Sequence, residues 1–263
     1  MIRFGTGGIS RRFWRVWQRN FIVYRKTWTI SFLPPLLEPI FYLVAFGVGL
    51  SVMVGEVTYG GATLSYTAFI APALIAVNIM QSAFFENTYA SFVRMYYQKT
   101  FDAMLATPLT LPEVIAGEIL WGATKAVIGT ALMMAVISLF GLISYPDGLL
   151  LLPAAFLGGL AFASAGMICT AIVPTIEVFN LPVFLFITPM FLFSGTFFPL
   201  QNLPPWAQSV AQIFPLTHLV ELTRTVALGR PGVSALVAII YLAVWTAILV
   251  PLAIIGMERR LIR

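Results

Sequence analysis

Six apolar segments, each long enough to cross a lipid bilayer, constrain the fold of this chain more than any other feature. A helix needs about 20 mostly apolar residues to span the hydrocarbon core. The segments that meet this length are 28–54, 64–92, 114–143, 149–173, 179–198 and 233–257. Only 10% of the residues are charged, against about 25% in soluble domains. The sequence therefore predicts an all-α integral membrane protein with one transmembrane domain over residues 1–263.

The basic residues are distributed unevenly between these spans. Seven of the 15 precede Trp28, and others follow the second and the last span. Basic residues favour the cytoplasmic side of a membrane, so we expect both termini to be cytoplasmic in a bacterial inner membrane. Arg224 and Arg230 are the exception, because this topology places them outside. The clustered charge also favours a membrane surface over nucleic acid as the partner.

The N-terminal arm, 4–27, has the periodicity of an amphipathic helix. The aromatic residues that recur at helical spacing are Phe13, Trp17, Phe21 and Tyr24, with Trp28 just beyond, and the basic residues on another face are Arg12, Arg15, Arg19 and Lys26. A helix of this kind lies in the membrane interface beside anionic headgroups. The alternative is that the arm is only an orientation signal.

A short helix is predicted at 100–107, between the second and third spans. Thr100 suits the N-cap and Asp102 the first turn, and the helix should end before Pro108. We expect this helix to expose three apolar side chains, those of Phe101, Met104 and Leu105, beside Asp102. Such a surface can dock a partner, or it can be tucked against the bilayer.

Glu38 and Lys125 are ionisable residues at similar depths in two spans that enter the membrane from the same side. Intramembrane charges are costly, and they face the protein interior or a wet cavity, often in pairs. We therefore predict that Glu38 and Lys125 form a pair or share a conduit. The alternatives are a Lys125 side chain that extends to the interface and a protonated Glu38.

The segment 199–216, after the fifth span, is apolar and interrupted by prolines. Its bracketing residues are Phe198, Pro199, Pro204, Trp206 and Phe214. This pattern predicts a re-entrant helical hairpin at the outer face, because irregular backbone at membrane depth needs protein or a wet cavity around it. The hairpin would be an outer gate or a lid that only packs.

The sequence shows no means of catalysis. Gly117 and Gly122 have the spacing of a phosphate loop, but no lysine follows directly and the segment belongs to a span. One histidine, His218, and one cysteine, Cys169, cannot form a His/Cys metal cluster. We expect no enzyme activity, no metal and no cofactor in this chain, so any energy must come from another subunit.

These features together resemble the ABC type-2 exporter permeases. The segments "RVWQRN", "EPIFYL", "SYTAFIAP" and "ITPMFLFSGTFFP" more closely resemble the permeases of nodulation lipo-oligosaccharide export. The resemblance implies a homodimer that works with two copies of a separate ATPase, which would bind the ATP and Mg. It also implies that Phe101, Asp102, Met104 and Leu105 form a coupling helix seated on the ATPase, and that the arm is an interface helix.

The cargo implied by the resemblance is an amphipathic glycolipid or lipo-oligosaccharide moved outward. A permease for drugs or other lipids is the alternative, since the same architecture serves those cargoes. A membrane enzyme that uses His218 and an ATP-independent channel are more remote alternatives. A neighbouring reading frame with a phosphate-loop ATPase would favour export, whereas activity of the purified chain alone would favour the enzyme or the channel.

Overall fold

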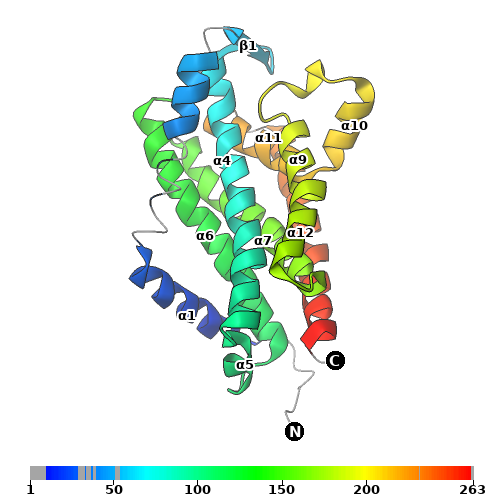
Figure 1. Cartoon of the computed structure of the whole chain (residues 1–263). Helices are drawn as coiled ribbons and strands as arrows, with labels where there is room; N and C mark the ends of the chain where they lie inside the picture. Colours follow the sequence, from blue (N-terminus) through cyan, green and yellow to red (C-terminus); the bar gives the residue numbers. More distant parts are fainter. Residues whose placement is uncertain are drawn as a thin grey trace.

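The computed structural model describes residues 10–28, 33, 37, 40–50, 54–230 and 232–261, and it is a bundle of long helices (Figure 1). Five of its helices are long and apolar enough to cross a membrane: Tyr66–Tyr97, Leu111–Leu139, Asp147–Ile172, Ile176–Phe193 and Val233–Leu261. Five of the predicted segments coincide with these candidate spans, with ends that differ by up to five residues. The other segment, 28–54, lies largely outside the described residues, so the count of six stays a prediction.

Several of these spans combine α-helix with segments of 3-10 helix or π-helix, and both of these types carry the label η. The elements in chain order are α1 (Phe13–Lys26), η1 (Leu43–Leu50), β1 (Glu56–Tyr59), β2 (Ala62–Ser65), α4 (Tyr66–Phe85), η2 (Glu86–Ala90), η3 (Val93–Tyr97), α5 (Thr100–Leu105), α6 (Leu111–Leu139), η4 (Asp147–Leu150), α7 (Leu151–Ile172), η5 (Ile176–Phe179), α8 (Asn180–Pro182), η6 (Val183–Ile187), α9 (Thr188–Phe193), η7 (Leu200–Asn202), α10 (Pro205–Ile213), α11 (Pro215–Ala227) and α12 (Val233–Leu261). The segments η1, η2, η3 and η6 are π-helical, and η4, η5 and η7 are 3-10 helices. Two π-helical segments, η2 and η3, extend α4 toward α5.

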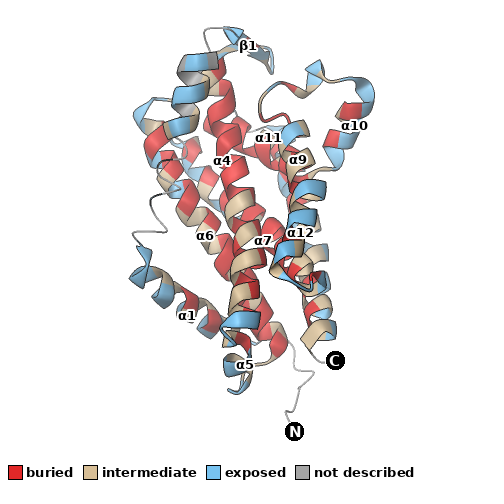
Figure 2. Ribbon diagram, in the orientation of Figure 1, coloured by how far each residue is buried: buried red, intermediate tan, exposed pale blue. Residues whose placement is uncertain are grey.

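Helices α4, α6 and α7 form the centre of the bundle, and small residues let them approach closely. A Cβ on Gly159 of α7 would lie 2.9 Å from the Cα of Ala123 on α6. A Cβ on Gly166 would lie 2.7 Å from the carbonyl oxygen of Phe84 on α4. Few residues of helix α12 and of the span Ile176–Phe193 are buried (Figure 2). Their outward faces are apolar, which suits contact with lipid.

Helix α1 packs along α6 through a second glycine contact. A Cβ on Gly117 would lie 2.5 Å from the Cβ of Val16 and 2.7 Å from the carbonyl oxygen of Phe13. The Trp17 indole donates a hydrogen bond of 2.8 Å to the Thr124 hydroxyl. Gly117, which has the spacing of a phosphate-loop glycine, therefore serves to bring two helices together.

A leucine at position 117 should push α1 away from α6. Overpacking of this kind costs about 1–3 kcal/mol, which corresponds to roughly 5- to 150-fold more of the detached state. We expect trypsin to cleave after Arg15 and Arg19 faster in Gly117→Leu than in the parent, in detergent. Ala131→Leu, at an exposed position of the same helix, is the control. Equal cleavage in both variants would contradict the packing role of Gly117.

The two ends of the bundle differ in character (Figure 1). The β-hairpin and α10 lie at one end, here called the hairpin end, and α5 lies with the C-terminal end of α12 at the other, the α5 end. The hairpin was not expected, although its signal is in the sequence. Gly60 and Gly61 both have positive φ, 56° and 76°, as a two-residue hairpin turn requires. The hairpin pairs Tyr59 with Ala62 and holds Tyr59 over α11.

Candidate functional site

Four charged side chains at the α5 end form a buried cluster, called the charge cluster. Its members are Glu86, Arg94, Glu118 and Lys125. Arg94 bridges the two acids, with Nη1 2.7 Å from Glu86 Oε1 and Nη2 2.5 Å from Glu118 Oε2. The Lys125 ammonium lies 2.7 Å from Glu86 Oε2. The cluster thus joins the π-helical end of α4 to α6.

Neutral side chains donate further hydrogen bonds to the carboxylates of Glu86 and Glu118. The Trp121 indole donates to Glu86 Oε1 at 3.0 Å, and the Ser91 hydroxyl donates to Glu118 Oε2 at 2.8 Å. The Asn20 amide, on α1, donates to Glu118 Oε1 at 2.7 Å. All four carboxylate oxygens therefore accept a hydrogen bond, which is what buried ions need in order to be stable. Asn20 also ties α1 into the cluster.

A cavity of about 430 Å³ opens beside the charge cluster, and Arg19, Tyr24 and Lys125 are among the residues that line it. Burial lowers the pKa of the Arg19 guanidinium, while the nearby Glu118 carboxylate opposes this shift. Burial and the Glu86 carboxylate both raise the pKa of the Tyr24 hydroxyl.

In the described part of the chain, no group of three or more His, Cys, Asp and Glu could hold a metal ion.

Lys125 has a partner that the sequence analysis did not consider. Its ammonium is paired with Glu86, whereas Glu38 lies outside the described residues, so a contact between Glu38 and Lys125 stays a prediction. The signal for the observed cluster was present, because Glu86 and Glu118 also fall within predicted spans. Ionisable residues at such positions are usually functional or paired.

Helix α5 confirms the predicted short helix but not its predicted surface. The Phe101 side chain is fully buried, so the expectation that it is exposed was wrong, because the ring packs into the core of the bundle. Met104 and Leu105 are partly buried against the same core. Asp102 and Ala103 are exposed. Lys99, in a left-handed conformation with φ 53°, occupies the N-cap position in place of Thr100.

The basic and aromatic residues of α1 are used in different ways. Arg12 donates a hydrogen bond of 2.8 Å to the carbonyl oxygen of Pro108, just after α5, and Arg15 is exposed. The aromatic face is partly occupied by protein, since Trp17 contacts α6 and Phe21 lies edge-on to Trp121. Contact of this helix with a membrane interface stays a prediction.

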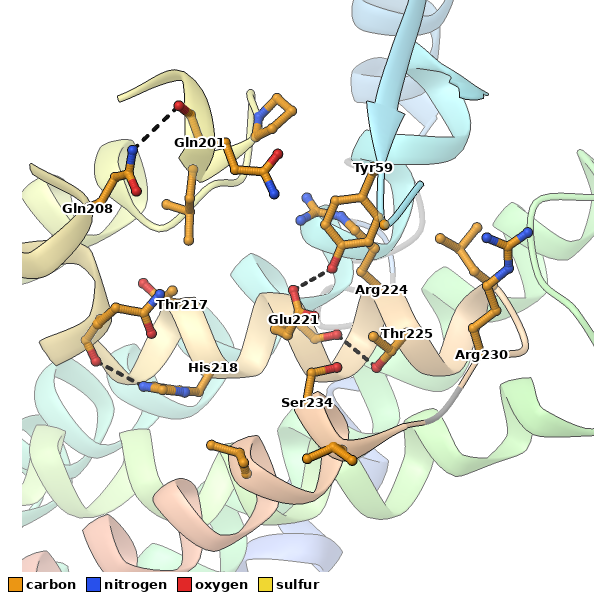
Figure 3. Close-up of a pocket in the computed structure, with 17 residues that line it drawn as sticks. Tyr59, Gln201, Gln208, Thr217, His218, Glu221, Arg224, Thr225, Arg230 and Ser234 are labelled. Atoms are coloured by element: carbon orange, nitrogen blue, oxygen red, sulfur yellow. Dashed lines mark hydrogen bonds between the residues drawn. The ribbon is translucent and has the colours of Figure 1, made fainter. Parts of the chain in front are cut away.

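At the hairpin end, a pocket of about 780 Å³ is enclosed by the β-hairpin, the segment η7–α10, α11 and the start of α12 (Figure 3). The Tyr59 hydroxyl donates a hydrogen bond to the Glu221 carboxylate (Figure 3). Burial, followed by this hydrogen bond, raises the pKa of Tyr59 well above its ordinary value. We call this cavity the outer pocket; its residues Tyr59, Glu221 and Arg224 were not among the predicted site residues.

Arg224 is the structural centre of the outer pocket wall. The residue is 3% exposed, and its guanidinium donates to the carbonyl oxygens of Phe69, at 3.2 Å, and Gly195, at 2.9 Å. It also lies 3.9 Å from the Phe69 ring centroid and 5.0 Å from that of Tyr59. Arg224 therefore connects α11 to α4, to the hairpin and to the turn after α9.

Of the predicted gate residues, only Pro199 lines the outer pocket. Trp206 is 67% exposed and Phe198 is also exposed. Pro204 caps the start of α10, and Phe214 connects α10 to α11. The segment 199–216 holds η7, α10 and the first residues of α11, and its re-entrant hairpin at the outer face and its role as a gate stay predictions.

Comparison with known proteins identifies relatives over most of the chain. Residues 11–228 match the family model described as ABC-2 type transporter. Nodulation protein J of Rhizobium leguminosarum bv. trifolii is 41% identical over 94% of this chain and 93% of its own length. Nodulation protein J of Sinorhizobium fredii is 38% identical over 94% of this chain and 93% of its own length. The inner membrane transport permease YadH of Escherichia coli is 24% identical over 78% of both chains. The chain therefore belongs to the ABC-2 type transporter family of membrane permeases.

Proposed function

We propose that this chain is the permease subunit of an exporter that moves an amphipathic glycolipid or lipo-oligosaccharide outward across the inner membrane. The observation that carries the proposal is its 41% identity to a nodulation protein J over 94% of the chain, together with the resemblance to nodulation lipo-oligosaccharide export permeases. The working complex is a homodimer of this chain with two copies of a separate ATPase, which binds the ATP and Mg.

In this proposal, α5 is the coupling helix and rests on the ATPase in the cytoplasm. The buried Phe101 ring anchors α5 in the bundle, so the exposed residues Asp102 and Ala103 contact the partner. A displacement of α5 passes through η3 to Arg94 and the charge cluster, and through Asn20 to α1. Both termini are cytoplasmic, and the hairpin end faces outward. This topology follows from the basic residues near the span ends.

An arginine at position 103 should uncouple the permease from its ATPase. Ala103 is exposed, so Ala103→Arg should insert and fold normally, while the bulky charge obstructs the docking surface. We expect cargo-stimulated ATP hydrolysis of the complex to fall by about tenfold or more, as for the loss of about 1.4 kcal/mol of coupling. Thr63→Arg, at an exposed position of the opposite end, should leave hydrolysis unchanged. If cargo stimulated ATP hydrolysis in Ala103→Arg as much as in the parent, α5 would not be the contact with the ATPase.

The function itself is tested by co-purifying the chain with the ATPase encoded beside it and measuring hydrolysis in nanodiscs. Candidate glycolipids should raise the hydrolysis rate, and a hydrophobic drug of similar size should not. Stimulation by the drug alone would instead support drug export. Catalysis or ion flux by the purified chain without any ATPase would overturn the proposal.

A further inference from the structure

The outer pocket presents polar side chains that the protein itself does not use. Gln201, Gln212, Arg230 and Ser234 line it, and no hydrogen bond or ion pair joins their side chains to another described residue. The amides of Gln201 and Gln212 each offer a carbonyl acceptor and two N–H donors. Polar groups converging on a sizeable concavity are the usual features of a ligand site.

The wall behind these groups is rigid. Glu221 is held by the Tyr59 hydroxyl (Figure 3). His218 makes a contact of 2.9 Å with the carbonyl oxygen of Gln212 and stacks on Tyr241 with 3.8 Å between the ring centroids. Arg224 is fixed by two carbonyl oxygens. The wall is therefore pre-organised, and the conformational entropy lost on binding comes mainly from the exposed side chains that contact the ligand.

The charges of the pocket wall largely balance, and one excess positive charge remains, on Arg230. The negative Glu221 and the positive Arg224 lie on one face of α11 and balance each other, and both contact Tyr59. Arg230 is the remaining cation of the lining and lies at an exposed position. A sugar hydroxyl both donates and accepts a hydrogen bond, so a mixed lining of amides, hydroxyl, carboxylate and guanidinium matches a hydroxyl-rich surface.

One side of the pocket is apolar and continuous with the exposed surface of α12. Val233 and Val237 line the pocket and are 81% and 51% exposed. Leu236 and Ile240, on the same helix, are also exposed. A molecule with its polar part in the pocket could therefore keep an alkyl chain along α12 in the bilayer.

We propose that the outer pocket binds the neutral saccharide portion of the amphipathic cargo while its lipid portion stays in the outer leaflet. The proposal rests on the proposed function, and it adds the part of the cargo that is recognised and the residues that recognise it. Gln201, Gln212 and Ser234 bind the sugar hydroxyls, and Arg230 binds at the rim.

Saturation-transfer NMR on the purified permease in lipid nanodiscs tests the proposal, with maltotriose and triacetylchitotriose as neutral probes. At least one probe should receive saturation from the parent protein. The double variant Gln201→Leu with Gln212→Leu should weaken binding about tenfold, as expected when hydrogen bonds worth about 1.4 kcal/mol are lost. Both side chains are exposed, so folding should be unaffected. Asn202→Leu, adjacent in sequence but outside the lining, is the matched control and should bind like the parent.

A cysteine at position 200, in a Cys169→Ser background, gives a second measurement, because Leu200 lines the pocket but is not among the side chains proposed to bind the sugar. Its labelling by a soluble maleimide should be slowed by the same oligosaccharide. Equal NMR signals in all variants, or labelling that the sugar does not slow, would overturn the proposal. Binding of inorganic phosphate without binding of either sugar would also overturn it. These tests use the permease alone, whereas the proposed function is tested by glycolipid-stimulated ATP hydrolysis of the complex. Either test can therefore fail while the other succeeds.

Discussion

Replacement of Arg94 by leucine is expected to destabilise the protein by about 3–5 kcal/mol, the cost of breaking a buried ion pair by removing one partner. Arg94 bridges Glu86 and Glu118, whose side chains are 4% and 0% exposed. Without the guanidinium, the donors that remain to Glu118 among the described residues are the neutral Asn20 and Ser91. Glu86 keeps Lys125, so most of the loss should arise at Glu118.

Unfolding of Arg94→Leu in detergent, followed by the reactivity of the half-buried Cys169 thiol, measures this effect. The double variant Arg94→Leu with Glu118→Leu should recover part of the stability, because it removes the stranded acid as well. Lys99→Met is the control: Lys99 pairs with Asp102 at 4.0 Å, and both side chains are largely exposed, so little change is expected. If Arg94→Leu were no worse than Lys99→Met, the charge cluster would not be a source of stability.

Replacement of Arg224 by methionine should also be strongly destabilising, by about 2–5 kcal/mol. Hydrogen bonds to a charged group contribute about 1.5–3 kcal/mol, and a desolvated cation–π contact adds up to about 2 kcal/mol. Methionine fills a similar volume but leaves the carbonyl oxygens of Phe69 and Gly195 without their donor. The damage should be local to the hairpin end, because Arg224 connects its elements.

Hydrogen exchange of the purified protein would locate the damage. Amides of α11 and of the β-hairpin should exchange faster in Arg224→Met, while those at the centre of α6 should stay as protected as in the parent. Arg230→Met is the matched control, since Arg230 is exposed and makes no side-chain hydrogen bond to a described residue. Uniform loss of protection along the chain would show that Arg224 acts on the whole bundle.

The apolar segments were sufficient to predict the helices, because hydrocarbon admits few other structures. Their length and composition located five candidate spans, with ends that differ by up to five residues. The surface of α5 was not predictable in the same way. Six residues are too few to show a reliable periodicity, so the sequence could not tell that Phe101 faces the bundle and Ala103 faces solvent. That distinction depends on which neighbours pack against the helix.

The polar contacts were harder to predict, because they join residues that are far apart in sequence. Tyr59 and Glu221 are separated by 162 positions, and their contact requires both the unexpected β-hairpin and the bend between α10 and α11. The environment of Arg224 explains why this basic residue departs from the preference for the cytoplasmic side. It is buried and bonded to backbone carbonyls, so it is a structural residue rather than a surface charge.

The π-helical segments η2 and η3, between α4 and α5, make the orientation of α5 depend on the number of residues that separate these two helices. Each π turn holds an extra residue that an α-helix would not accommodate, and one residue of an α-helix corresponds to a rotation of about 100°. Deletion of a single residue from η2 or η3 could restore a regular helix, and it would turn everything beyond it, including Phe101 and the exposed face of α5, toward a different neighbour. Homologues should therefore vary in the length of their loops but conserve the spacing from Glu86 to Phe101.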